Sequence, residues 1–552
     1  MIWLRAIVMN IFSPGYIRGE SMPGDQSWVA RGLRYPVDDR GRGGAWGRIE
    51  ALGAPWPLLR ACVVGSAILL GGCAVAPREA PEPGSIVAEP RQRFVAAGPG
   101  AAAPVVDAWW TRFDDPLLTE YVDRAGFHHP SVLQAVARVE QARAQARIAR
   151  ADLYPQVDGR FSASRQRQNL AGLGVGALLP TSPGQGGGDT GQAADQATGF
   201  TTGSFSLDAS VSWELDLWGR IGAQNAAARA DFLASAENLR AVRQSIAAQV
   251  ARSYFALIEA RRQVAVSEER VGALAEIARQ VGDRADVGVA PPGDKALAFA
   301  NLDQARAGLA QRREASERAA RAFDTLIRAW PDGAVVAGEV LPEAPPPPPA
   351  GLPAGLLARR PDVRAARLAL AAAGYREAAA ERALLPGISL TGSAGTSSSE
   401  LSSLLDGDSF VWSIAGAILQ PIFQGGRLRA QVEAAEGRKA EAIAAYAEVA
   451  LQALSEVETA LAVDEVLAQR QLALSSAAEA AERSVAISFN RYRAGLEPFI
   501  TVLQSEQTAL DARSAYVAAS RARLDNRVDL HLALGGGFDD PAIPPPPVEQ
   551  PR

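Results

Sequence analysis

Around Gly219, two different sequence periodicities meet. Before it, residues 205–217 alternate strictly, with apolar side chains from Phe205 to Leu217 on one face and Ser, Asp or Glu between them. This pattern predicts a strand with one apolar face, longer than the about 5–6 residues usual in soluble sheets and long enough to cross a bilayer. After it, an Ala- and Arg-rich run continues without Pro for about 60 residues, which at about 1.5 Å per residue predicts a helix of about 90–100 Å. A compact domain cannot enclose such a helix.

The composition excludes several classes of function. Lys and Arg alternate with Asp and Glu, and the net charge is −5, so a nucleic-acid partner is not expected. Two Cys and three His are too few for a disulfide framework or a Cys/His metal cluster, so we expect no metal. No nucleophile elbow or metalloprotease motif occurs, and the glycine-rich residues 172–176 lack the Lys-Ser/Thr end of a phosphate loop. We expect no enzyme activity and no cofactor other than a covalent lipid.

The N-terminal region contains the pattern of a bacterial lipoprotein signal. Apolar residues 61–70 lead into Leu70-Gly71-Gly72-Cys73, which predicts a lipid on Cys73; the alternative is a short buried helix with an incidental Cys. Residues 1–72 would then be leader and signal, and residues 73–105 a Pro/Glu/Ala-rich tether. This leader is longer than the usual 15–30 residues, which suggests that translation starts near Leu52 and that residues 1–51 are a mis-annotated start. Ala74 after the Cys favours sorting to the outer membrane.

The chain also contains a repeat of very long period. Pro130 matches Pro361 and Pro155 matches Pro386 at one common offset. Gly219 matches Gly426 and Gly288 matches Gly495 at a second, shorter offset. The first half therefore holds extra residues, which fall in the Gly-rich residues 169–203 and are predicted to be a flexible loop.

Each half is predicted to run helix, strand, loop, strand, long helix, tip and helix. In the first half these elements are residues 131–153, 156–167, 205–217, 221–281 and 295–329, and in the second 362–384, 388–396, 410–420, 428–490 and 499–534. The domains follow as a first repeat (106–330), a Pro-rich linker and equatorial segment (331–358), a second repeat (359–535) and a Pro-rich tail (536–552).

Four strands cannot close a membrane barrel, because the smallest barrels use about eight. Open sheet edges in lipid would leave backbone N–H and C=O groups without partners. We therefore predict a mainly α fold with membrane β, in which three chains share one twelve-stranded β-barrel continuous with a long periplasmic α-helical barrel.

The longest helix supports packing on several sides. Apolar residues recur in it at heptad spacings: Val432, Ala435, Ala442, Tyr446, Val449, Ala453, Ala460, Val463, Leu467 and Leu474. An ordinary amphipathic core helix would explain this stripe equally well. Small residues at Ala440, Ala444, Ala445 and Ala450 lie on other faces, which would allow neighbours on a second side.

Taken together, these motifs resemble the TolC-like outer-membrane factors (outer membrane efflux proteins), in particular their NodT-type lipoprotein branch. The resemblance covers about residues 109–536 and rests on the motifs Leu70-Gly71-Gly72-Cys73, Trp109-Trp110, Phe113-Asp114-Asp115-Pro116-Leu117, Leu153-Tyr154-Pro155-Gln156, Trp213-Glu214-Leu215-Asp216-Leu217-Trp218-Gly219, Arg359-Arg360-Pro361-Asp362-Val363, Gln420-Pro421-Ile422-Phe423 and Arg491-Tyr492-Arg493-Ala494-Gly495. It implies a homotrimer in the outer membrane, serving as the exit duct of a tripartite efflux pump. Its partners would be a periplasmic adaptor (membrane fusion) protein and an inner-membrane RND-type transporter.

The resemblance also implies positions for a gate. The tip turns would be formed by Gly288 and by Tyr492, Arg493 and Gly495, at the periplasmic end. The residues that follow would form the constriction: Ile500, Thr501 and Gln504. Many relatives carry Asp at the position of Gln504, forming a cation-binding ring. This chain lacks that ring, so an apolar ring of Ile500 would gate by dewetting, and Glu497 is a nearby substitute carboxylate.

Two tryptophans, Trp213 and Trp218, frame the end of the first-half strand, where an interfacial aromatic belt would lie; core packing is the alternative. Two other functions stay open at this point. The chain could be the outer-membrane duct of a type I protein-secretion system, or a periplasmic coiled-coil scaffold lipoprotein whose strands form a small sheet. The sequence does not indicate the exported substrate.

Overall fold

The computed structural model describes residues 93–95, 107–169, 199–348 and 353–538. The chain divides into two units, Met1–Gly71 and Gly72–Arg552, and every described residue belongs to the second. Cys73, the loop residues 170–198 and the tail from residue 539 onward lie outside the described residues, as do residues 1–51 with the predicted alternative start.

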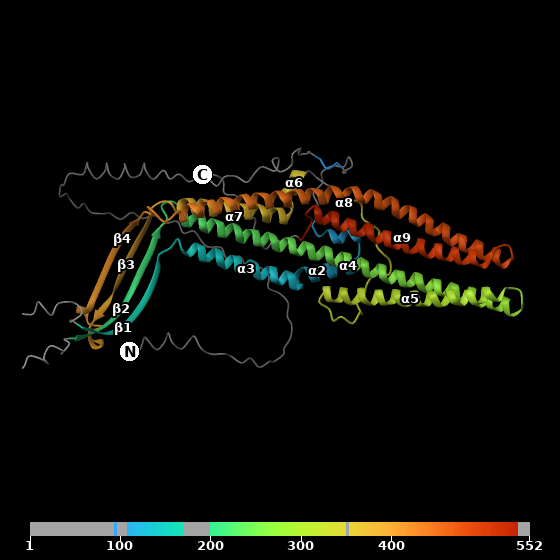
Figure 1. Cartoon of the computed structure of the whole chain (residues 1–552), viewed down its shortest axis with the longest axis horizontal. Coiled ribbons are helices and arrows are strands. Elements are labelled where there is room, and N and C mark those ends of the chain that lie inside the picture. Colours follow the sequence, from blue (N-terminus) through green and yellow to red (C-terminus); the bar gives the residue numbers. More distant parts are fainter. Residues whose placement is uncertain (1–92, 96–106, 170–198, 349–352, 539–552) are drawn as a thin grey trace, which may run out of the picture. The chain divides into compact units, whose positions relative to one another are not determined.

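The described elements form two matching sets (Figure 1). The 3-10 helix η3 (Trp109–Phe113) comes first. The first set is α2 (Pro116–His128), α3 (Pro130–Ala151), β1 (Gln156–Asn169), β2 (Gly199–Leu215), α4 (Arg220–Asp286) and α5 (Pro292–Leu326). The second is α6 (Pro353–Arg359), α7 (Pro361–Arg382), β3 (Gly387–Ser398), β4 (Phe410–Leu419), α8 (Arg427–Arg493) and α9 (Phe499–Ala533), with short 3-10 turns η6 (Leu401–Ser403) and η7 (Gly407–Ser409). Helices α4 and α8 each have 67 residues, and α5 and α9 each have 35.

The same local chemistry starts the paired helices. Pro130 and Pro361 stand at the first position of α3 and α7, where the missing N–H costs no hydrogen bond. Gly219 and Gly426 precede α4 and α8 with φ of 75° and 84°, a left-handed conformation that glycine adopts without a Cβ clash. The strand therefore turns sharply into the long helix at the same place in both halves.

The four strands form one antiparallel sheet in the order β1-β2-β3-β4. The register places Phe161 beside Leu207 and Leu207 beside Thr396, while Ser162 stands beside Ser206 on the opposite face. One face is therefore mostly apolar and the other mostly polar. Among the described residues, β1 and β4 have no strand on their outer sides, and every residue of β4 is exposed.

The helices extend from the sheet in two hairpins, α4–α5 and α8–α9, whose tips lie at the end away from the sheet (Figure 1). Three clusters of buried apolar side chains hold them together. The first gathers η3 and α2 on the middle of α4 and includes fully buried Trp109, Trp110 and Phe255; the second joins α6, α7, α8 and the end of α9; the third lies at the tips. In the described part of the chain, no helix combines the length and the apolar character needed to cross a membrane.

Several element limits differ from the predictions. The predicted flexible loop at residues 169–203 begins and ends as strand, because β1 reaches Asn169 and β2 starts at Gly199 with a continuous register. The predicted strand end at Leu217 is wrong by two residues, since Asp216 leaves the sheet and caps α4. Helix α4 continues to Asp286, as far as the turn at Gly288.

The packing of α8 also differs in part. Of the predicted heptad stripe, Ala435, Tyr446, Ala453 and Ala460 are buried, but Val463 is 38% exposed. Ala450, predicted to face a second neighbour, is fully buried inside the chain. The reason is that α8 packs on α7 in its first part and on α9 beyond, so a single straight stripe cannot face both.

Two short pieces outside the predicted repeats are part of the core. Phe94, within the predicted tether, is 4% exposed in the second cluster, and the Val95 N–H donates to Oε1 of Glu458 over 2.7 Å. Phe538, within the predicted tail, packs on Trp110 with ring centroids 4.5 Å apart. An isolated aromatic residue next to Pro-rich sequence does not reveal such long-range contacts.

Candidate functional site

The two helix tips have the same backbone geometry. The N–H groups of Gly288 and Val289 donate to the carbonyls of Ala285 and Arg284, which closes the end of α4 as a Schellman turn. At the end of α8, Gly495 and Leu496 form the corresponding bonds to Tyr492 and Arg491. Gly288 and Gly495 have φ of 77° and 74°, so a Cβ at either position would be strained.

Tyr492 joins the tips of the two hairpins. Its ring is 7% exposed and packs on Phe499 of α9, with ring centroids 5.2 Å apart. The guanidinium carbon of Arg284, on α4, lies 5.5 Å from the centre of the same ring, and its Nη1 donates to the Arg493 carbonyl over 2.9 Å. The Tyr492 hydroxyl lies 3.4 Å from Oδ2 of Asp294 on α5, near the outer limit of a hydrogen bond. Burial and the charge of Asp294 raise the pKa of Tyr492, so the phenol stays a neutral donor.

The predicted constriction residues lie directly after this link, in the first turns of α9. Ile500 is 48% exposed, Gln504 is exposed one turn further on the same side, and Thr501 is partly buried between them. The other side of α9 contributes Val502 and Leu503 to the buried tip cluster. Ile500 and Gln504 are thus available to a neighbouring molecule or to a water-filled space.

Two carboxylates lie near these residues. Glu497, suggested by the sequence as a substitute ligand, is engaged by Arg491, whose Nε lies 2.5 Å from Oε1. Glu506 is buried on the inner side of α9, and this burial raises its pKa, against the opposing effect of Arg270. Within the described ranges, no group of three or more His, Cys, Asp or Glu side chains is arranged to hold a metal ion.

The predicted aromatic pair lies where the sheet meets the helices. Nε1 of Trp213 donates to the Leu153 carbonyl over 3.1 Å, and Nε1 of Trp218 donates to the Pro386 carbonyl over 2.7 Å. Trp218 remains 46% exposed. Trp213 therefore joins β2 to the α3–β1 connection of the same repeat. Trp218 joins the turn after β2 to the α7–β3 connection of the other repeat.

This junction is also held by polar contacts around the helix start. Asp216 accepts from the Ile221 and Gly222 N–H groups over 3.0 and 2.6 Å, which satisfies two of the free N–H groups at the N-terminus of α4. Arg382 at the end of α7 donates to the Gly219 carbonyl over 2.7 Å. The orientation of the sheet on the helices is therefore fixed by hydrogen bonds from both repeats.

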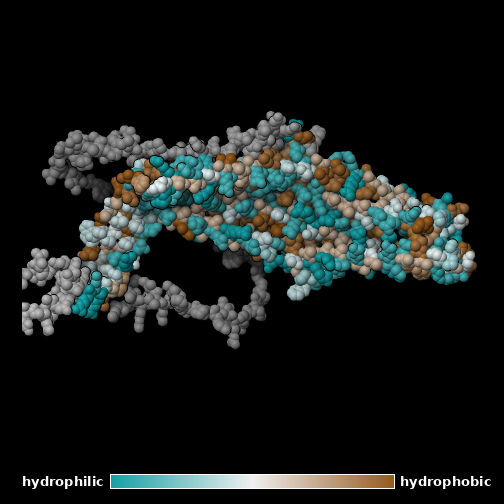
Figure 2. Space-filling view, viewed as in Figure 1, coloured by the Kyte–Doolittle hydropathy of each residue, from teal (hydrophilic) through white to brown (hydrophobic). Residues whose placement is uncertain are grey.

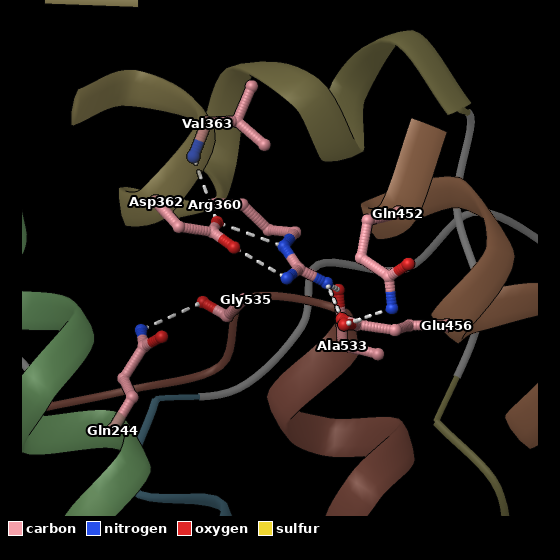
Figure 3. A network of polar contacts seen from close by, with 8 residues as sticks. All are labelled: Gln244, Arg360, Asp362, Val363, Gln452, Glu456, Ala533 and Gly535. Atoms are coloured by element: carbon pink, nitrogen blue, oxygen red, sulfur yellow. Dashed lines mark hydrogen bonds and ion pairs between the residues drawn. The ribbon is translucent and has the colours of Figure 1, made fainter. Parts of the chain in front are cut away.

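A third polar site, which we call the Arg360 clasp, binds the end of α9 (Figure 3). Arg360 is 7% exposed and pairs with both oxygens of Asp362, at 3.0 Å from Nε and 2.6 Å from Nη2. Its Nη1 donates to Oε2 of Glu456 on α8 over 2.6 Å and to the Ala533 carbonyl on α9 over 3.1 Å. A cation at a helix C-terminus also compensates the helix dipole. The clasp thus joins α7, α8 and α9.

The charges of the clasp stabilise one another. Burial alone would lower the pKa of Arg360, but Asp362 and Glu456 outweigh it and raise that pKa. Burial would likewise raise the pKa of Asp362, but the Arg360 guanidinium outweighs it and lowers that pKa. Arg360 and Asp362 are therefore both charged at neutral pH.

The sequence pointed to the tip turns and the junction tryptophans but missed their partners. Arg284 and Asp294 lie in the first repeat and Tyr492 in the second, and no local spacing connects them. Glu456 could not be assigned to Arg360 for the same reason. The one available signal was the Arg360-Pro361-Asp362 motif itself, whose Pro indicates a helix start with a charged group on either side.

Comparison with known proteins places these features in a family. The model of the outer membrane efflux protein family matches residues 122–327 and 352–536. The chain is 32% identical to outer membrane protein OprJ of Pseudomonas aeruginosa over 481 residues, covering 86% of this chain and 95% of OprJ. It is 30% identical to the cation efflux system protein CusC of Escherichia coli over 497 residues, covering 88% of this chain and 99% of CusC.

Solved structures agree with this. The outer-membrane channel OprN superposes with a TM-score of 0.72 at 26% identity, covering 82% of this chain and 98% of OprN. The Neisseria gonorrhoeae MtrE outer membrane channel, in its open state, superposes with a TM-score of 0.69 at 29% identity, covering 82% and 97%. The chain therefore belongs to the outer membrane efflux protein family and is an outer-membrane channel component of an efflux pump.

Proposed function

We propose that three copies of this chain form one exit duct, with their sheets closed into a twelve-stranded barrel and their helices continuing as a periplasmic tube. The observation that carries this is the sheet itself. Within the described residues it has one apolar face and two edges without a strand partner, and lipid does not tolerate open edges. Pairing β4 of one copy with β1 of the next satisfies both edges and closes the ring without altering the chain.

The duct is gated at the helix tips. Tyr492 and Arg284 hold the α8–α9 hairpin against the α4–α5 hairpin, and this link ties the position of Ile500 and Gln504 to the packing of the two hairpins. In a trimer, the exposed Ile500 side chains would converge as an apolar ring that excludes water and ions when narrow. Tilting of one hairpin away from the other would widen that ring.

The exposed surface of the tips supports a proposal for the partners. The exposed apolar side chains at the tips, Val287, Val289 and Leu496, form a surface suited to the periplasmic adaptor, through which an inner-membrane RND-type transporter delivers substrate. Cys73 anchors each copy to the membrane by lipid. The cargo is small molecules rather than proteins, because relatives are named for pyoverdine export and for cation, solvent, toluene and antibiotic efflux.

The first test is the assembly. Protein expressed with its native leader and extracted from outer membranes in mild detergent should have the mass of a trimer and carry lipid on Cys73. A detergent-free monomer would refute the duct, and a trimer without lipid would refute only the anchor.

The second test is the gate, by single-channel recording in planar bilayers. Ile500→Ser should raise the basal conductance, because a polar ring stays wet, and Gln504→Asp should make the channel sensitive to block by divalent cations. Ile148→Ser, at an exposed apolar position on α3, is the matched control. Equal conductance in the Ile500 and Ile148 variants would exclude the Ile500 ring.

A further inference from the structure

The apolar face of the sheet ends at Phe205, on the side away from the helices. It begins beside the helices at Leu215, which pairs with Ile388, and continues outward along β2 through Trp213, Val211 and Leu207 to Phe205. The last levels are aromatic, since Phe161 on β1 and Phe410 on β4 lie level with Leu207 and its partner Thr396.

This run has the length of a bilayer crossing. A tilted membrane strand needs about 9–11 residues, which is the span from Leu215 to Phe205. Trp213 lies near the helix end of the band and Phe205 at the far end, as in the two aromatic girdles of membrane sheets. Because the helices mark the periplasmic side, Phe205 marks the outer leaflet.

Two arginines lie on this same face immediately beyond Phe205. Arg165 stands opposite Gly203, one pleat further out, and Arg167 stands opposite Thr201, two pleats further out. Both side chains are exposed, and neither guanidinium forms an ion pair or hydrogen bond with a residue of the described ranges. The end of the sheet away from the helices is correspondingly hydrophilic in Figure 2.

The neighbouring arginine of β1 is in a different environment. Arg160 alternates onto the polar face and stands directly opposite Asp208. The polar face therefore gives its arginine an acidic neighbour across the strand, whereas the apolar face gives Arg165 a glycine and Arg167 a threonine. Neither Arg165 nor Arg167 faces an acidic residue across the strand pair, so a partner for their charges must lie outside the sheet.

We propose that Arg165 and Arg167 bind the phosphate groups of outer-leaflet lipid; this inference rests on the proposed membrane barrel. A charge on the lipid face is costly in hydrocarbon but nearly free at the interface, where both residues lie. There the opposing groups are phosphates, which a guanidinium binds with paired N–H donors. Spacing at i and i+2 directs both side chains outward from one strand, so that one headgroup bearing two phosphates can engage both.

A second copy of the chain is the competing occupant. Glu400, Asp406 and Asp408 lie in the connection between β3 and β4, which a neighbouring copy would bring towards β1. These carboxylates belong to a connection with no fixed strand face, whereas Arg165 and Arg167 occupy paired strand positions on the apolar face. The positions therefore favour lipid phosphate over a neighbour's carboxylates.

The test uses purified intact protein with its native leader, in mild detergent, and bis-phosphorylated lipid A as the probe. Binding is titrated by native mass spectrometry for the wild type, the Arg165→Gln/Arg167→Gln double variant and the control Arg160→Gln. With about a factor of 5 from each arginine near a phosphate surface, we expect the double variant to bind about 25-fold more weakly and the control to bind as the wild type. Millimolar inorganic phosphate should not compete, because the lipid is held by its acyl chains as well.

Unchanged lipid A affinity in the double variant, or full competition by inorganic phosphate, would overturn the proposal. Loss of the trimer in the double variant without lipid A would also overturn it, because the arginines would then contact a neighbouring copy. A wild type that is monomeric without detergent would refute the barrel and this site together. A detergent-requiring wild-type trimer with an unchanged double variant refutes the lipid site alone.

Discussion

Replacing Arg360 by Met tests how much the clasp contributes to holding the end of α9. Met keeps an unbranched apolar stem but removes every donor, so the Ala533 carbonyl, Glu456 and Asp362 all lose a partner (Figure 3). Arg360→Lys keeps the charge but loses the paired donors to Asp362.

The magnitude follows from the burial of the partners. Breaking a fully buried ion pair costs about 3–5 kcal/mol, whereas an exposed pair is worth about 0–1 kcal/mol. The Arg360 side chain is 9% exposed, but the side chains of Asp362 and Glu456 are 38% and 39% exposed and can regain water. With about 1 kcal/mol more for the helix-terminal carbonyl, we expect Arg360→Met to cost about 3 kcal/mol and Arg360→Lys about half of that.

Hydrogen exchange measures this locally, without requiring reversible unfolding of the whole assembly. The N–H groups of Leu534, Gly535 and Gly536 bond to carbonyls in the last turn of α9, beside the clasp. A loss of about 3 kcal/mol should accelerate their exchange by about 100-fold, and the Lys variant should give about 10-fold.

Arg359→Met is the matched control, because Arg359 is the exposed neighbour of Arg360. It should change exchange in the last turn of α9 by less than about twofold. If the Arg360 and Arg359 variants behave alike, the clasp does not stabilise the helix end and the argument from burial is refuted. Acceleration spread evenly over all helices would also refute it, since the effect would then be global.

Three further predictions concern the gate, pH and the sheet junction. Arg284→Ala removes the hydrogen bond to the Arg493 carbonyl and the cation–π contact with Tyr492, which together contribute about 1–2 kcal/mol, so bilayer recordings should show about 5- to 30-fold more channel opening. The control Arg279→Ala, whose ion pairs stay within α4, should leave channel opening unchanged. Equal opening in both variants would contradict the link between the tips. Burial raises the pKa of Asp525 to about 6, so the protonated carboxyl favours the folded state below about pH 4, and this stabilisation is lost as pH rises through about 6. Asp525→Asn, which stays neutral, should therefore raise the melting temperature at pH 8 but not at pH 4. An equal rise at both pH values would contradict the burial of a charged carboxylate. Asp216→Ala should lower stability by about 1–2 kcal/mol and accelerate exchange only in the first turn of α4, and unchanged exchange there would exclude the cap.

The parts of the fold that were predicted well depend on short-range patterns. Strict alternation in residues 205–217 predicted a strand, and the Ala-rich runs predicted helices that are confirmed to within about five residues at each end. The glycines at the helix starts and tips were identifiable because their role is set by their own φ, not by distant neighbours. The roles of Ile500, Thr501, Gln504 and Cys73 remain predictions.

The parts that were missed depend on which surfaces come together. The heptad stripe leaves Ala450 on a second face of α8, yet Ala450 is buried in the same cluster as Tyr446 and Ala453 of the stripe. Phe94 and Phe538 lie next to Pro-rich sequence that predicts tether and tail, yet both are packed in the core. A single aromatic residue carries no periodicity, so its burial can be seen only when the surface that receives it is present.

The sequence by itself therefore determined the two repeats, the apolar face of the sheet and the tip turns, because backbone propensity and side-chain alternation act over a few residues. Only the tertiary structure decided that Arg284 meets Tyr492 and that Arg360 meets Glu456 and Ala533. These pairs lie far apart in the chain, and long helices bring them together only after packing has set their rotation and register.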